Sequence, residues 1–309
     1  ENLLDSSGNV QGTPKYNWTP IGRGYSNSSD SYNGVFDGTG YSISGLYSNG
    51  TENYCGFFGK MNKGTIKNLS IVDSYFGKSS CYFVGSFVGY GHSYSNIENC
   101  YSNATIVGWY YCGGIAGETK GTVSNCLYNG KIKSTRNSNA IATDYKSYGK
   151  LTNCYYNENC GLSSSRATAV TAAQLSSGEV AYLLNGDQSA INWCQNVDKG
   201  EKDNAPTLNS EHYRVYKGDN IYTNDLDKHS HVYKNGICTY CEYGVEEPQL
   251  VDNYYEISSY GNLIWFQRYV DAGNVNINAK LTSDIIANEN LLDSSGNVQG
   301  TPKYLSLIH

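Results

Sequence analysis

The sequence has little charge, little proline and a single methionine. Charged residues make up 16% of the chain, the formal net charge is −6, and no run of basic residues occurs. A nucleic acid is therefore not an expected partner. No apolar stretch reaches the roughly 18 residues that a membrane-spanning helix needs, so no membrane span is expected in this segment.

Glycine, tyrosine, serine and asparagine are abundant instead. The chain has 34 glycines and 30 tyrosines, and aromatic residues make up 13% of it. That many aromatic residues can bury surface, so the composition indicates a β-rich, turn-rich extracellular protein rather than a disordered one. The 10 cysteines exceed what a typical cytosolic domain carries. Secretion with disulfides is one interpretation of them, and buried thiols are another.

A segment of the sequence occurs twice, word for word. ENLLDSSGNVQGTPKY fills residues 1–16 and again 289–304. This identity predicts one period of a tandem array of roughly 290-residue units, which would build an extended molecule. The alternative is an artificial joining of two copies of one segment. Residues 305–309 match nothing upstream and are left unassigned.

A shorter repeat occupies residues 40–161. Each copy opens with glycines that flank apolar residues, at 56–59, 85–89 and 113–117. Each copy then reaches an aliphatic residue; these are Ile66, Ile97, Val123 and Leu151, which are 31, 26 and 28 residues apart. A period of roughly 20–50 residues built from short strands predicts a solenoid.

Stacking of successive turns explains the residue choices. In a parallel β-helix each turn lies about 4.8 Å from the last, so equivalent positions stack on themselves. The four aliphatic residues would form one inward column. Asparagine tolerates a left-handed bend, so a corner column of mutually bonded amides is expected at Asn68, Asn99, Asn125 and Asn153. We therefore predict an all-β fold, a right-handed parallel β-helix over residues 1–165.

The position after each asparagine holds a leucine or a cysteine. Leu69 is followed along this column by Cys100, Cys126 and Cys154. Cysteine behaves there as a small buried hydrophobe, so we expect buried thiols. A stacked disulfide is the alternative.

Three segments resemble GLUG-motif proteins, which are large bacterial surface or secreted proteins. Residues 35–46 (VFDGTGYSISGL) resemble the opening of that repeat, with Thr39 where asparagine is usual. Residues 112–117 resemble its glycine-rich core, and residues 171–186 resemble the segment that follows the repeats. The likeness covers about residues 15–220 and weakens at 139–149, where the glycines are lost. It implies an adhesin-like region without shared enzymatic residues.

Different signals follow the repeats. Over residues 166–217, Thr171 and Gln174 form a capping-box pair that predicts a short helix over the end of the solenoid, followed by closing strands. Residues 218–250 are a polar linker. Residues 251–304 are expected to start the next unit, with a helix within 258–271 and then a strand. That helix would cap the next solenoid.

The linker holds one candidate metal site. His229 and His231 precede a C-x-x-C pair, Cys238 and Cys241, around an Asn-Gly turn. Two imidazoles and two thiolates suit a structural, tetrahedral zinc ion. A disulfide between the two cysteines with surface histidines is the alternative.

No catalytic constellation stands out. The carboxylates fall at different phases of the repeat, so we expect no enzyme. Stacked, exposed tyrosines favour binding of a surface glycan or protein, and the alternative is that tyrosine simply suits the pleated surface of a sheet. The candidates are Tyr82, Tyr101, Tyr110, Tyr111, Tyr155 and Tyr156. The predicted function is a non-catalytic structural or adhesive repeat at a bacterial cell surface, and a carbohydrate-active β-helix, lyase-like or hydrolase-like, is the alternative.

Overall fold

The chain divides into two units, Glu1–Asp225 and Leu226–His309, and each is described by itself. The computed structural model describes residues 2–22, 30–50, 53–134, 136–143, 149–186, 188, 190–218, 221–225 and 245–285. Of residues 233–234 and 237–238 it describes the backbone. None of the described helices is long and apolar enough to cross a membrane.

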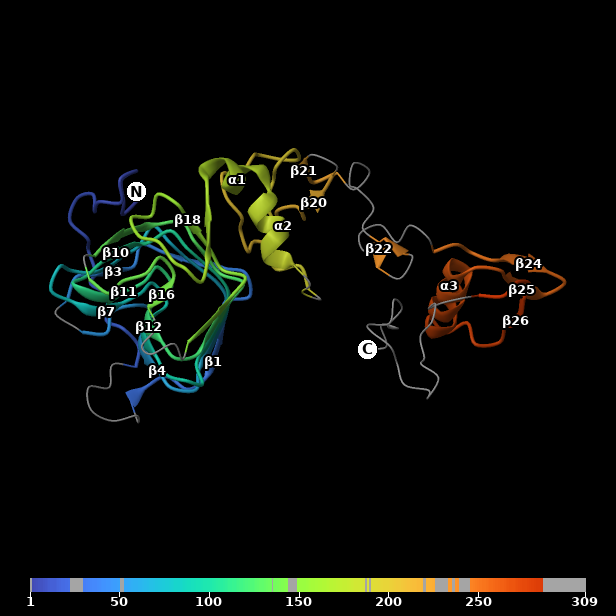
Figure 1. Cartoon of the computed structure of the whole chain (residues 1–309), viewed down its shortest axis with the longest axis horizontal. Coiled ribbons are helices and arrows are strands. Elements are labelled where there is room, and N and C mark those ends of the chain that lie inside the picture. The colour runs from blue at the N-terminus through green and yellow to red at the C-terminus, as the bar shows by residue number, and fades with distance from the viewer. Residues whose placement is uncertain are drawn as a thin grey trace. The chain divides into compact units, whose positions relative to one another are not determined.

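The first unit consists mainly of short strands that pair in parallel (Figure 1). Its largest sheet has nine strands. These are β1 (Val35–Asp37), β2 (Ser42–Ser44), β5 (Thr65–Val72), β9 (Asn96–Ser102), β13 (Thr122–Ser124), β14 (Leu127–Tyr128), β17 (Lys150–Thr152), β18 (Tyr155–Asn157) and β19 (Thr168–Val170).

Three smaller parallel sheets accompany it. One contains β3 (Tyr47–Ser48), β6 (Tyr75–Gly77), β10 (Thr105–Val107) and β15 (Lys131–Lys133). Another pairs β7 (Tyr82–Val84) with β11 (Tyr110–Cys112). The last contains β4 (Phe58–Met61), β8 (Val88–Gly91), β12 (Ala116–Thr119) and β16 (Ala142–Thr143). The chain visits these sheets in a repeating order, and we call one such visit to the sheets a pass. Each strand lies beside its counterpart from the previous pass.

The register follows the spacing of the sequence repeat. Ile66 pairs with Ile97, Ile97 with Val123, and Val123 with Leu151, as predicted. The first three side chains are buried in the main core and Leu151 packs against it. One irregularity lies between β12 and β16, where the register shifts. β16 belongs to residues 139–149, the segment in which the sequence repeat lacks its glycines.

The four asparagines all adopt the left-handed conformation, with φ of 52° for Asn68, 48° for Asn99, 51° for Asn125 and 49° for Asn153. The expected chain of amide bonds is only partly formed. Asn153 donates to Asn125 at 2.9 Å, whereas Asn68 donates to Asp37. Asn99 Oδ1 is buried without a hydrogen-bond partner, so no neighbouring amide donates to it. The bend therefore selects asparagine at these four positions more strongly than the amide bonding does.

The cysteine column is buried. Cys100, Cys126 and Cys154 are free thiols, and each Sγ lies within hydrogen-bonding distance of two carbonyls, one of its own turn and one of the preceding turn, either of which can accept its single S–H. Burial raises the pKa of Cys126 well above its ordinary value. The Cys126 thiol and burial together raise the pKa of Cys154 in the same direction.

These thiols make the fold sensitive to alkali. In the unfolded chain Cys126 and Cys154 ionise near the ordinary thiol pKa of about 8.5, while in the folded chain they keep their protons. The unfolded state then binds fewer protons, so the free energy of unfolding falls as pH rises above about 8.5, by up to about 1.4 kcal/mol per pH unit for each thiol. Urea unfolding between pH 7 and 9.5 measures this slope. Cys126→Ala should flatten it, and an equal slope in that variant would contradict the assignment.

Two helices follow the last strand of the largest sheet. In α1 (Ala172–Ser177), Thr171 and Gln174 form the predicted capping box. In α2 (Glu179–Asn185), the first N–H bonds to Ser177 Oγ. Leu175, Val180 and Leu184 join Leu127, Tyr155, Val170, Trp193 and Leu208 in a second core. The unit continues through an antiparallel bridge between Cys194 and Thr207 to β20 (Tyr216–Lys217) and β21 (Tyr222–Thr223).

The second unit contains a strand–helix–strand crossover. β24 (Gln249–Val251) pairs antiparallel with β25 (Tyr254–Ile257). α3 (Tyr260–Asp271), which begins after Ser259 as its N-cap, then leads to β26 (Asn278–Leu281), and β26 pairs with β25 in parallel. The helix and strand expected there are thus present. β22 (Tyr233–Lys234) and β23 (Ile237–Cys238) form a separate antiparallel pair.

Candidate functional site at an aromatic corner

Aromatic residues gather at the two-stranded sheet of the first unit. Tyr82 of β7 pairs with Tyr110 of β11, and Val84 pairs with Cys112. The preceding pass supplies Tyr54, whose neighbour Cys55 bridges to Val84, and the following pass supplies Arg136, which bridges to Tyr110. We call this group the aromatic corner; its members are Tyr54, Tyr82, Phe83, Tyr90, Trp109, Tyr110 and Tyr111.

Phe83 and Tyr111 occupy the same position in successive passes, and both have φ of 55°. The left-handed conformation costs a residue with a Cβ about 1–2 kcal/mol, and bulky side chains rarely adopt it. In the next pass this position holds Asn137, with φ of 42°. Asparagine thus suffices for the backbone, so the bend does not explain the aromatic rings at the other two positions.

The inner rings of the corner form a stack. Tyr54 and Phe83 stack with centroids 5.1 Å apart and planes 15° apart, and Phe83 and Tyr111 with centroids 4.9 Å apart and planes 10° apart. Tyr90 meets Phe83 edge-on. Such pairs contribute about 0.5–1.5 kcal/mol each, which offsets the strain of the left-handed backbone.

Glycines allow the corner to pack closely on the neighbouring sheet. A Cβ on Gly89 would lie 2.7 Å from the Phe83 carbonyl oxygen. A Cβ on Gly117 would lie 2.5 Å from Phe83 C and 2.6 Å from Val84 N. These atoms belong to the backbone and cannot rotate away. The glycines that end the second and third copies of the repeat, Gly89 and Gly117, therefore allow the backbone of the strained corner to pack closely.

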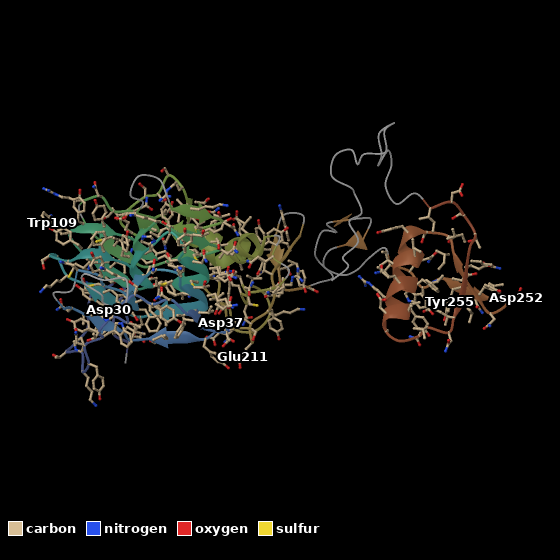
Figure 2. The ribbon with its side chains drawn as sticks, turned by 90° about the horizontal axis from the view of Figure 1, so that it is seen from below. Asp30, Asp37, Trp109, Glu211, Asp252 and Tyr255 are labelled. Carbon is tan, nitrogen blue, oxygen red and sulfur yellow. The ribbon has the colours of Figure 1, made fainter. Side chains whose placement is uncertain are left out.

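The outer rings reach solvent. Trp109 is 40% exposed, and it meets Tyr82 edge-on at 5.2 Å between centroids. The Arg136 guanidinium lies 5.6 Å from the centroid of the Trp109 ring. Asn137 donates to the Tyr110 hydroxyl. Figure 2 shows Trp109 at the edge of the first unit, on the far side of it from Glu211.

Cations border the inner stack as well. Lys60 Nζ lies 4.1 Å from the centroid of the Tyr54 ring, and burial lowers the pKa of Lys60. Burial also raises the pKa of the Tyr54 hydroxyl. The corner thus combines aromatic surface, neutral hydroxyls and cationic side chains. Such a surface can stack on sugar rings and donate hydrogen bonds.

The structure sorts the six candidate tyrosines into two groups. Tyr82, Tyr110 and Tyr111 meet in the aromatic corner. Tyr155 and Tyr156 do not present a binding face, because they are 9% and 5% exposed. Tyr155 lies in the second core with α1 and α2, Tyr156 lies in the main core, and Tyr101 packs against the second core. The assignment as ligand-facing is wrong for Tyr155, because the repeat period did not show which strand the helices cover, and for Tyr156, because its side chain is buried in the main core.

Four members of the corner were not singled out from the sequence: Tyr54, Phe83, Tyr90 and Trp109. One signal could have found Phe83. It stands between Tyr82 and Val84 as Tyr111 stands between Tyr110 and Cys112, so the two segments align residue by residue.

The predicted zinc ligands are not tested. His229, His231 and Cys241 lie outside the described residues, and Cys238 is described by its backbone in β23. Within the described part of the chain, no group of three or more histidine, cysteine or acidic side chains could hold a metal ion. The zinc site stays a prediction.

Comparison with known proteins gives no match: no family model, no curated protein and no solved structure matches this chain.

Proposed function

We propose that the first unit is a right-handed parallel β-solenoid of the GLUG kind, and that it serves as a non-catalytic, adhesive repeat of a bacterial surface protein. The repeated visiting order of the sheets supports the solenoid. Crossovers between parallel strands of one sheet are nearly always right-handed, which supports the hand.

The aromatic corner carries the proposed binding function. Two aromatic residues occupy a strained position that asparagine fills in the next pass. The stacking of these rings offsets the strain, so the corner keeps a preformed aromatic surface at this position. The corner also exposes Trp109 beside a guanidinium, which is the kind of surface that binds sugars or protein side chains. A surface glycan is the ligand we favour.

The placement of the carboxylates supports a non-catalytic role. Glycoside-cleaving sites need paired carboxylates on one face. Glu98 stands between Lys67 and Ser124 in the register, and Glu118 stands beside Tyr90 and Thr143. Asp37 pairs with Lys67. Each of these carboxylates therefore has neighbours of other kinds in the adjacent passes, not a second carboxylate.

Trp109→Ala should weaken glycan binding with only a small loss of stability. The indole is part of the exposed surface, and its loss removes one stacking platform, so the Kd should rise roughly tenfold or more. The loss of its edge-on contacts with Tyr82 and Tyr110 should lower the free energy of unfolding by about 1 kcal/mol, so the chain stays folded under the conditions of the binding assay. Binding is measured by calorimetry against a neutral glucan, a uronate-rich polysaccharide and mucin.

The matched control is Tyr94→Ala, which removes another exposed aromatic, 68% exposed, that is not part of the corner. Equal affinity in the Trp109 and Tyr94 variants, or no binding by the unaltered chain to any of the three probes, would count against a glycan site at the corner. Hydrolysis of a probe into shorter products would favour the carbohydrate-active alternative.

A further inference from the structure

Residues 2–11 fold into a small hairpin on the side of the first unit. Leu4 and Val10 form an antiparallel bridge, and the Gln11 N–H donates to the Leu3 carbonyl. The Asp5 carboxylate closes the turn by accepting the N–H groups of Ser7 and Asn9. We call this hairpin the strap. Its conformation is set by its own residues.

Three side chains from three successive passes hold the strap. The N–H groups of Leu3 and Leu4 donate to the two carboxylate oxygens of Asp73, at 2.6 and 2.8 Å. Thr105 Oγ donates to the Gly8 carbonyl at 2.8 Å, and Lys133 Nζ donates to Asn9 Oδ1 at 2.7 Å. We call Asp73, Thr105 and Lys133 the strap site.

Asp73 differs from its equivalents in the later passes. The register of β6 and β10 places Asp73 opposite Asn103, and the Asp73 N–H donates to Asn103 Oδ1. The next passes continue this column with Asn129 and Asn157, which bond to each other. An asparagine offers one acceptor oxygen, whereas the two N–H groups of the strap need two. The carboxylate thus stands at the one position of this column that receives the strap.

Gly8 fits the strap site so closely that no other residue can replace it. It is buried, its φ is +75°, and a Cβ there would lie 2.5 Å from Thr105 Oγ1 and 3.1 Å from Lys131 Cγ. A substitution at Gly8 would therefore incur both backbone strain and a clash.

All the strap atoms that contact the strap site belong to residues 3–9, and the sequence repeats these residues at 291–297. The second copy supplies the same N–H groups from Leu291 and Leu292, the same glycine at Gly296 and the same amide at Asn297. We propose that the strap site of one copy of this chain binds residues 289–299 of a second copy, so that copies associate head to tail through an exchanged strap.

The exchange replaces each contact by an identical one, as in domain swapping. The chain's own strap has the advantage of a short tether, which raises its local concentration at the site. The exchanged form is therefore expected when the chain's own strap is weakened. A head-to-tail contact of this kind builds closed rings or open chains of copies. The proposal does not depend on what the aromatic corner binds.

Two variants of the full-length chain test it. In the first, residues 3–10 are replaced by a glycine–serine segment of equal length, so that the strap site is vacant and residues 289–299 are intact. Its mass, measured by light scattering after gel filtration, should rise with concentration. In the second, Gly296→Ala is added, and this variant should stay monomeric. A labelled peptide ENLLDSSGNVQGTPKY should bind the second variant and dissociate the assemblies of the first.

The controls distinguish binding of the peptide at the strap site from association between copies of the chain. The same peptide with its glycine at position 8 replaced by alanine should not bind, and Asp73→Asn in the second variant should weaken peptide binding roughly tenfold. Failure of the peptide to bind the second variant would overturn the strap site as a recognition site. If the peptide binds the second variant but the first variant stays monomeric at every concentration, association between copies would be overturned.

A milder pair of variants tests the proposal if the first variant fails to fold. Gly8→Ala in an otherwise unaltered chain should assemble to a smaller extent, and Gly8→Ala with Gly296→Ala should not. Equal mass for these two at high concentration would also overturn the proposal.

Discussion

Gly117→Ala is expected to destabilise the first unit by about 3 kcal/mol or more, at the upper end of what overpacking costs. Gly117 lies in β12, and an added Cβ would come within 2.5 Å of the Gly89 carbonyl oxygen and of Phe83 C. Both atoms belong to backbones of the previous pass, so strands of neighbouring sheets would have to separate. Chemical denaturation followed by circular dichroism measures the loss.

The control is Gly45→Ala. Gly45 has φ of +75° and no atom within 4 Å of an added Cβ, so this variant bears the backbone strain without a clash and should lose about 1 kcal/mol. Gly117 does not have positive φ, so its whole effect comes from packing. If the two variants unfold at the same denaturant concentration, the close approach of β12 to the aromatic corner is not what the glycine provides.

Asn153→Ala should have an effect of similar size in the following pass, next to the helices. Asn153 Nδ2 donates to Asn125 Oδ1 and to the carbonyls of Leu183 and Leu184 at the end of α2, and Asn153 Oδ1 accepts from the Tyr155 hydroxyl. Alanine removes these bonds, although the Leu184 carbonyl still accepts from Gln188 Nε2, and it must also adopt φ near 49°. Losses of roughly 1–3 kcal/mol for an unsatisfied group and about 1 kcal/mol for the bend give about 2–4 kcal/mol.

A series at this position distinguishes the causes. Asn153→Gly removes the hydrogen bonds and relieves the bend, while Asn153→Asp keeps the acceptor oxygen and loses the donors. Asn68→Ala is the matched control, because Asn68 has the same backbone but contacts Asp37 in place of a helix. Hydrogen exchange should show that residues 179–185 lose protection in the Asn153 variants alone. Unchanged protection there would mean that Asn153 does not hold α2.

The sequence repeat predicted the register of the parallel strands, but it did not predict which side chains are exposed. The spacing of Ile66, Ile97 and Val123 placed them side by side, because one residue per pass must face the core when passes stack. The capping box was equally predictable, because it depends only on two residues three positions apart, Thr171 and Gln174. Both signals are local or periodic, and both are confirmed.

The features that the sequence hid depend on packing between distant segments. Tyr155 and Tyr111 each belong to a Tyr-Tyr pair in the sequence, yet Tyr155 is buried because α2 begins 24 residues later and packs on its strand in the second core. The contact between Leu3 and Asp73 joins residues 70 positions apart and leaves no periodic trace. The aromatic corner needed knowledge of the backbone, because only φ reveals that Phe83 and Tyr111 are strained.

The strap also determines where a pulling force would enter the first unit. Its contacts are distributed over Asp73, Thr105 and Lys133, which belong to three successive passes. A tension applied at residue 2 would therefore be shared by side chains of all three passes and would not act on a single pass alone. The segment before the first strand thus links passes that are far apart in the sequence, and a pulling force would have to break these contacts before it reached β1.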